Sequence, residues 1–145
     1  MRRIKSERGA ALLEAAITIP MLLLVSVGIF EFGRAYQTWQ ILTNAAREGA
    51  RMAVLSDSSN SDIRSRVTQY MTDGQLGAVG SATVGVNRSA TLNVNGRSVS
   101  ASDVTIDYPF SFIVLQPVAR LVAPQTSIGG AVVIHAEAVM RNETQ

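Results

Sequence analysis

RGAALLEAAITIPMLLLV, Arg8 to Val25, is the stretch that decides the fold. It opens with a basic residue and a glycine and then runs through apolar residues that enclose one carboxylate, Glu14. The apolar run extends to Phe30, so that 21 residues from Ala10 onward contain one charge and one proline. At a rise of ~1.5 Å per residue, a helix of this length measures ~31 Å, about the thickness of the hydrocarbon core of a membrane. The stretch therefore predicts a transmembrane helix.

The residues before this helix set its expected orientation. MRRIKSER, residues 1–8, carries four basic residues and one acidic residue. By the positive-inside rule this segment stays in the cytoplasm, and the chain after Phe30 lies outside. Beyond residue 9 there are nine basic and ten acidic residues, a net charge of −1, so no basic patch for nucleic acid is left. The absence of cysteine excludes disulfides and thiolate metal sites.

A secretory signal peptide is the main alternative for this N-terminus, because it also places an apolar run after a basic one. Three features argue against it. Glu14 interrupts the apolar run, the run is longer than that of a typical signal peptide, and no convincing small-x-small cleavage site follows. We therefore expect the apolar segment to be retained.

Helical character continues beyond the apolar run. EFGRAYQTWQILTNAAREGARMAVL, residues 31–55, contains no proline and repeats small and apolar residues at helical spacing. We expect one helix from Ala10 to Leu55, ~69 Å long. Its small residues form a stripe on which a helix or a sheet can approach closely; they are Ala45, Ala46, Gly49, Ala50 and Ala53. The stripe either seats the rest of this chain or receives another subunit, and the sequence leaves both uses open.

A short amphipathic helix is expected at the start of the remaining segment, residues 56–145. Its apolar face contains Ile63, Val67, Tyr70 and Met71. Ser61, before Asp62, is the expected N-cap, and Gly74 is the expected end. The QLGAVGS stretch that follows predicts a loop.

From Ala82 the period of the apolar residues changes to two, which indicates strands. Asn95-Gly96 predicts a hairpin turn because both residues tolerate positive φ. Residues 103–108 and 131–140 alternate between an apolar and a more polar face, and we expect these two strands to lie side by side. Residues 110–122, FSFIVLQPVARLV, are broken by Pro117 and predict a crossover with a short helix packed on the sheet. The fold class is therefore α+β, a long N-terminal transmembrane helix followed by a small extracytoplasmic head with an antiparallel sheet.

The sequence predicts no catalytic or metal centre. His135 is the single histidine, and with Glu137 on its strand face it supplies at most two of the three or four ligands of a zinc site. Asp103 and Asp107 would lie ~13 Å apart along their strand, too far for a carboxylate pair. Neither a nucleophile elbow nor a glycine-rich phosphate loop occurs. We expect no enzyme, cofactor, metal or small-molecule substrate; a membrane-tethered hydrolase built around His135 is the least favoured hypothesis.

Gly9 and Glu14 remain to be explained. Glycine disfavours the helix by ~1 kcal/mol relative to alanine, so Gly9 marks a point where the chain can leave the helix and enter a protease cleft. A cut after Gly9 would give Ala10 a free amine that is largely cationic at neutral pH. In a bundle of such helices this amine is the natural partner of Glu14, since an unpaired carboxylate is costly in a membrane. The alternative is that the Glu14 side chain turns toward the lipid headgroups and has no further role.

A basic leader, a glycine, and a glutamate five residues later in an apolar helix resemble the class III signal of type IV pilins and pseudopilins. In those proteins a membrane aspartic peptidase cuts on the cytoplasmic side after the glycine, and the glutamate is needed for filament assembly. The resemblance implies cleavage between Gly9 and Ala10 and an assembly role for Glu14. Arg8 to Leu55, above all EFGR at 31–34 and LTNAAREGAR at 42–51, is similar to the TadE-like family of the tight-adherence (Flp) pilus system.

This resemblance implies a non-enzymatic minor pilin or pseudopilin of the bacterial inner membrane, with a cytoplasmic N-terminus and a periplasmic head. Its parts would be a leader at residues 1–9, a helix at 10–55 and a head at 56–145. The implied partners are a prepilin peptidase, other pilin subunits, pilus assembly proteins and the membrane, and no nucleic acid. Major Flp pilins are usually shorter and carry tyrosine after the glutamate; here Ala15 follows Glu14, which favours a minor subunit.

The alternative is an uncleaved single-pass anchor. Its extracytoplasmic head would bind a component of a secretion or adhesion system, and its N-terminus would stay intact. Cleavage after Gly9 distinguishes the two hypotheses.

Overall fold

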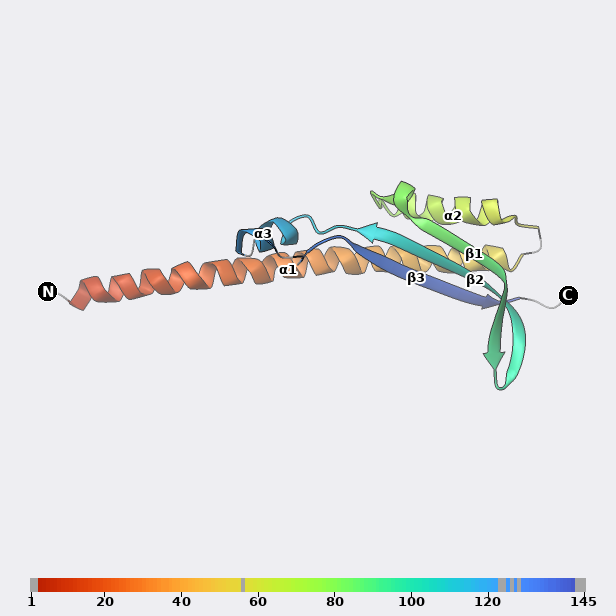
Figure 1. Cartoon of the computed structure of the whole chain (residues 1–145), viewed down its shortest axis with the longest axis horizontal. Coiled ribbons are helices and arrows are strands. Elements are labelled where there is room, and N and C mark those ends of the chain that lie inside the picture. Colours follow the sequence, from red (N-terminus) through yellow and green to blue (C-terminus); the bar gives the residue numbers. More distant parts are fainter. Residues whose placement is uncertain (1–2, 56, 123–124, 126, 128, 143–145) are drawn as a thin grey trace. The chain divides into compact units, whose positions relative to one another are not determined.

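The structure is a computed structural model that describes residues 3–55, 57–122, 125, 127 and 129–142. Its elements follow in the order α1, α2, η1, β1, β2, α3 and β3 (Figure 1). They form two compact units. Unit 1 comprises Met1–Arg34 and Phe112–Gly130, and unit 2 comprises Ala35–Ser111 and Ala131–Gln145. The predicted fold class is confirmed, because a long apolar helix is followed by a small antiparallel sheet.

Helix α1, Arg3–Ala53, begins earlier than predicted. It includes most of the expected leader, and Gly9 lies inside it. Pro20 also lies inside the helix, where it removes one backbone donor without ending the helix. Among the described residues, the part from Gly9 onward is the one helix long and apolar enough to cross a membrane, and none of its most apolar stretch is buried within the chain.

Helix α2, Asn60–Asp73, begins at a capping box. The Ser59 hydroxyl accepts from the Asp62 backbone N–H at 3.2 Å, and the Asp62 carboxylate accepts from the Ser59 N–H at 3.0 Å. The predicted N-cap, Ser61, is therefore wrong by two residues, because Ser59 is the position that has an acidic residue at N3. The helix ends at Gly74 as predicted.

The sheet contains three antiparallel strands in the order β1-β2-β3. Strand β1 spans Thr83–Val94, β2 spans Arg97–Phe110 and β3 spans Val132–Arg141. Asn95 and Gly96 join the first two with φ of 52° and 79°, which confirms the predicted two-residue turn. The expected pairing of the last two strands is also confirmed, since Asp107 lies opposite His135 and Ile106 opposite Ala136.

The core of unit 2 lies between the apolar face of the sheet and the two helices of this unit. Val104, Ile106 and Tyr108 are buried from β2, as the period of two predicted. Helix α2 buries Ile63, Val67 and Met71. The second half of α1 supplies Leu42 and the small residues described below. The Tyr108 hydroxyl accepts a hydrogen bond from the Ala78 N–H at 2.9 Å, which ties the start of the short 3-10 helix η1, Val79–Ser81, to the sheet.

Helix α3, Leu115–Val122, is the short helix expected after β2. Pro117 lies in its first turn. Backbone N–H groups in the first turn have no acceptor within the helix, so proline causes no loss of a hydrogen bond there. The sequence predicted that this helix packs on the sheet. In the structure it belongs instead to unit 1, together with the first part of α1.

Candidate functional site

Gly9 and Ala10, the predicted cleavage position, both lie in helical backbone and are exposed. A Cβ built on Gly9 would meet no atom within 4 Å, so the glycine is not required there by packing. Its remaining physical property is a low helix preference. Access of a protease to this bond requires that the surrounding helix first unwind.

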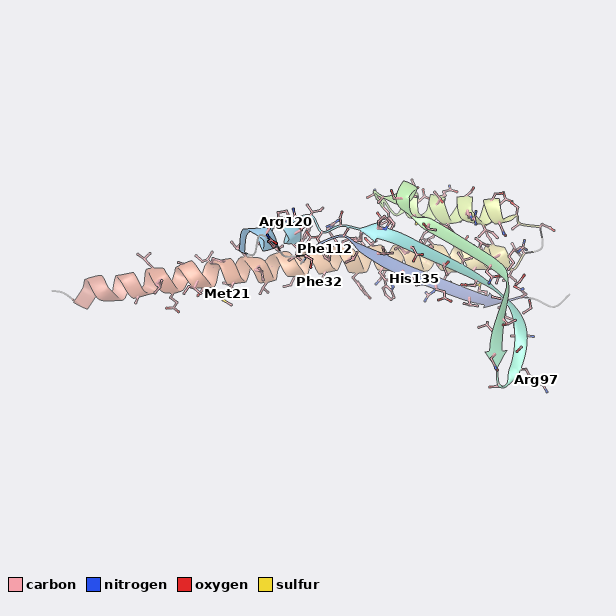
Figure 2. All side chains as sticks on the ribbon, viewed as in Figure 1. Met21, Phe32, Arg97, Phe112, Arg120 and His135 are labelled. Carbon is pink, nitrogen blue, oxygen red and sulfur yellow. The ribbon has the colours of Figure 1, made fainter. Side chains whose placement is uncertain are left out.

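The Glu14 side chain is exposed and lies within the apolar part of α1. Most large apolar side chains between Leu12 and Phe32 are also exposed, Met21 for example to 66% (Figure 2). Among the residues whose side chains the structure describes, none forms an ion pair with Glu14. The segment thus presents one exposed carboxylate among mostly apolar, exposed side chains.

The stripe of small residues is buried inside unit 2. Its alanines, Ala45, Ala46, Ala50 and Ala53, are at most 1% exposed. Gly49 is the tightest point, because an added Cβ would lie 2.6 Å from Val67 Cγ2 and 3.1 Å from Val104 Cγ1. Helix α2 and the sheet therefore approach this stripe as closely as the missing side chain allows.

Glu31 has the most contacts among the described carboxylates of unit 1, and its role was not apparent from the sequence. Its side chain is fully buried, and one oxygen accepts from the backbone N–H groups of Ile113 (2.7 Å) and Val114 (2.5 Å). Its other oxygen accepts from the Arg34 guanidinium at 2.6 Å. Both amides lie at the start of α3, where helical N–H groups lack intrahelical partners. Glu31 therefore serves as a cap supplied by a different helix.

Phe32 and Phe112 extend this contact. Their ring centroids are 6.2 Å apart in an edge-to-face arrangement, and both rings are drawn at the junction of α1 with the segment leading into α3 (Figure 2). The pair places an apolar contact beside the Glu31 hydrogen bonds. The loop before α3 is thereby fixed to α1 at the residue that follows the apolar run.

Glu48 performs a similar task in unit 2. Its carboxylate accepts from Arg51 on the same helix at 3.0 Å and from Arg66 of α2 at 3.2 Å. Because Glu48 is mostly buried and binds two guanidinium groups, it links the two helices more firmly than an exposed ion pair would.

The end of α1 is held by a polar cluster from the sheet. The Arg88 guanidinium donates to the carbonyl oxygens of Ala53 (3.1 Å), Leu55 (2.6 Å) and Ser58 (2.7 Å). Carbonyl groups at a helix C-terminus lack partners and carry partial negative charge, so a cation is favoured here. Asn142 supports the cluster by donating to Ser100 Oγ at 2.8 Å.

The polar face of the sheet carries the single histidine. His135 Nδ1 lies 2.7 Å from Asp107 Oδ1, and Nε2 lies 4.0 Å from Glu137. The hydrogen bond to Asp107 raises the pKa of His135 above its ordinary value. Burial, with the nearby charge of Glu137, raises the pKa of Asp103, whose Oδ1 has no hydrogen-bond partner in the described part of the chain. Within that part, no three acidic, histidine or cysteine side chains are placed to hold a metal ion.

Residues 9–51 match the family model of TadE-like proteins. This match confirms the resemblance read from the sequence, over just under a third of the chain. No curated protein and no solved structure matches the chain.

The TadE-like segment, residues 9–51, contains most of the positions discussed above. Gly9, Glu14, Glu31 and Glu48 all lie within it. Arg88 and His135 lie outside it, so the match says nothing about the cluster at the end of α1 or about the polar face of the sheet. The TadE-like match suggests a subunit associated with the Tad pilus system, and this family is typically structural rather than enzymatic. The apolar helix fits a membrane-anchored protein of that kind.

Proposed function

We propose that this protein is a minor pilin or pseudopilin that a prepilin peptidase cleaves after Gly9 and that assembles through Glu14. The observation that carries the proposal is the exposed carboxylate of Glu14 on the apolar TadE-like segment, where the described part of the chain offers it no partner. In this proposal the protein is anchored in the bacterial inner membrane, its N-terminus is cytoplasmic and its head, residues 56–145, is periplasmic.

The chemistry of assembly follows from the spacing of the two groups. Cleavage converts the amide nitrogen of Ala10 into an amine that is largely protonated at neutral pH. Ala10 and Glu14 are separated by four residues, or about 6 Å along a helix. A neighbouring subunit shifted axially by about that distance brings its amine level with the Glu14 carboxylate. Pairing in an apolar bundle favours this register over others, because it places the amine of each subunit beside the carboxylate of its neighbour.

Cleavage requires one further step from the chain. Since Gly9 lies within α1, the first turns must unwind before the bond after Gly9 can enter a protease cleft in extended form. Glycine lowers the cost of that unwinding by about 1 kcal/mol relative to alanine, and its lack of a side chain lets a protein surface approach the backbone.

Two pairs of variants test the proposal in cells that have the Tad system. Gly9→Val should abolish cleavage, whereas Gly28→Val, at another helical glycine with open space around it, should leave cleavage intact. Glu14→Gln should be cleaved but should reduce piliation strongly, whereas Glu137→Gln, an exposed glutamate of the head, should not. Normal piliation of the Glu14→Gln strain would overturn the assembly role.

An uncleaved anchor is the second candidate function. The continuous helix through Gly9 favours it, because the peptide bond in question is helical in the structure. In this case an unrelated transmembrane helix substituted for residues 10–30 would preserve function. The proposal above predicts that this exchange abolishes it.

A further inference from the structure

Residues 112–122 are attached to α1 at the end of the apolar run. Glu31 directly follows Phe30, the last residue of that run. The Ile113 N–H donates to the Glu31 carboxylate at 2.7 Å, and the Phe112 ring contacts the Phe32 ring. If α1 spans a membrane, these contacts hold the segment at the level of the membrane surface.

Large apolar side chains are exposed at this level. Ile113 is 61% exposed and Phe32 is 65% exposed, although both adjoin a carboxylate that is completely buried. The segment FSFIVLQPVARLV contains a single charged residue, Arg120. Exposed apolar side chains at this level are costly in water and are stabilised in the boundary between lipid headgroups and acyl chains.

The backbone N–H groups of Ile113 and Val114 and the Glu31 carboxylate all have hydrogen-bond partners within the chain, as a site near hydrocarbon requires. Backbone N–H groups near hydrocarbon need internal partners, and Glu31 satisfies those of Ile113 and Val114. Arg34 compensates the carboxylate one turn further along α1. Arg120, exposed on α3, supplies a cation that suits a lipid phosphate group (Figure 2).

We infer that residues 112–122 form an interfacial element that lies in the membrane surface at the head-side end of the α1 span, with Ile113 and Phe32 in the acyl boundary and Arg120 toward lipid phosphate. The occupant of this surface is the lipid bilayer itself. The inference rests on the proposed membrane anchoring of α1, although not on cleavage or on the role of Glu14.

The chain contains no cysteine, so single nitroxide labels can be placed at will. We would label Ile113→Cys, Met21→Cys and Arg97→Cys in the full chain, reconstituted in vesicles of phosphatidylethanolamine and phosphatidylglycerol. All three positions are exposed, so labelling should not disturb the fold. The quantity measured is the accessibility of each label to oxygen, which concentrates in lipid, relative to a water-soluble nickel chelate.

The label at 21 should be embedded, the label at 97 should be in water, and the label at 113 should lie at a depth of about 5 to 10 Å in the boundary region. An oxygen-to-nickel accessibility ratio at 113 several-fold above that at 97 supports the inference. A ratio at 113 equal to that at 97, with 21 embedded, overturns the inference while leaving the anchor intact. Low accessibility of 113 to both reagents identifies a protein partner and also overturns it. A label at 21 that is not embedded overturns the membrane anchor and the inference together.

Discussion

The Glu31 carboxylate accepts a hydrogen bond from the Val114 N–H at 2.5 Å, although the two residues are 83 positions apart in the chain. This bond and its neighbour from Ile113 fix the loop before α3 to α1. Glu31, the residue that follows the apolar run, therefore binds a segment that is distant in the sequence.

Replacing Glu31 by alanine should release residues 112–118 from α1. Two backbone donors would lose their acceptor, at a cost of about 1 to 3 kcal/mol for each N–H left buried and unsatisfied. Hydrogen exchange of a peptide covering these residues should accelerate about tenfold or more, since each 1.4 kcal/mol is a factor of ten. Glu48→Ala, which removes a buried carboxylate from unit 2, should leave exchange in this peptide unchanged, and equal acceleration in both variants would contradict the specific role of Glu31.

Gly49 should tolerate no side chain. A methyl group there would lie 2.6 Å from Val67 Cγ2, so Gly49→Ala should lower the free energy of unfolding of the head by about 1 to 3 kcal/mol. Gly33→Ala on the same helix, where an added Cβ meets nothing within 4 Å, should be neutral or stabilising by up to about 1 kcal/mol. The loss caused by Gly49→Ala should be smaller in a Val67→Ala background, and chemical denaturation of the four variants, Val67→Ala alone included, measures each effect. Additive losses in the double variant would show that the two side chains do not meet.

Arg88 should be replaceable by neither lysine nor alanine without loss of stability. Lysine has no planar group that can donate at once to the carbonyl oxygens of Ala53, Leu55 and Ser58, so Arg88→Lys should destabilise the fold by about 1 to 3 kcal/mol. Arg97→Lys, at the exposed hairpin turn, provides the matched control and should change little. Chemical denaturation monitored by circular dichroism compares the two variants. Equal stability of both would show that the Arg88 hydrogen bonds do not stabilise the fold.

His135 should titrate above its ordinary range. Its hydrogen bond to Asp107 raises its pKa, so the pair stabilises the folded state below the ordinary histidine pKa of ~6.5, and this contribution is lost as the pH rises through the folded-state pKa. Because the chain has one histidine, its NMR signal can be followed without assignment. Asp107→Asn should lower the measured pKa, and raised salt should weaken the effect because both side chains are about half exposed. An identical pKa in the two proteins would show that the pair does not form in solution.

The sequence predicted those parts of the fold that depend on local periodicity. Alternation at Val104, Ile106 and Tyr108 assigned the buried face of β2, and Asn95-Gly96 assigned the hairpin. Two local assignments differed from the structure. The N-cap of α2 is Ser59 rather than Ser61, because Asp62 completes a capping box with the earlier serine. Helix α1 also begins before Gly9, since one glycine is too weak a helix breaker to end it.

Contacts between distant segments were not predictable in the same way. The partners of Glu31 are backbone N–H groups, which every residue except proline carries, so no side-chain pattern marks them. The only available signal was a carboxylate directly after an apolar run. The contacts of Arg88 were also not predictable from the sequence. Its acceptors are backbone carbonyl groups, and their distance from β1 depends on how the head folds. Gly9 and Glu14, in contrast, were predicted from their spacing within one short segment, and their roles stay a prediction.

Processing between Gly9 and Ala10 can be detected in the intact mass of the protein recovered from membranes. We would measure this mass in cells with and without the native prepilin peptidase. We expect a loss that corresponds to residues 1–9, seen only when the peptidase is present. A chain of full mass in both samples would show that this cleavage does not occur and would favour the uncleaved membrane anchor.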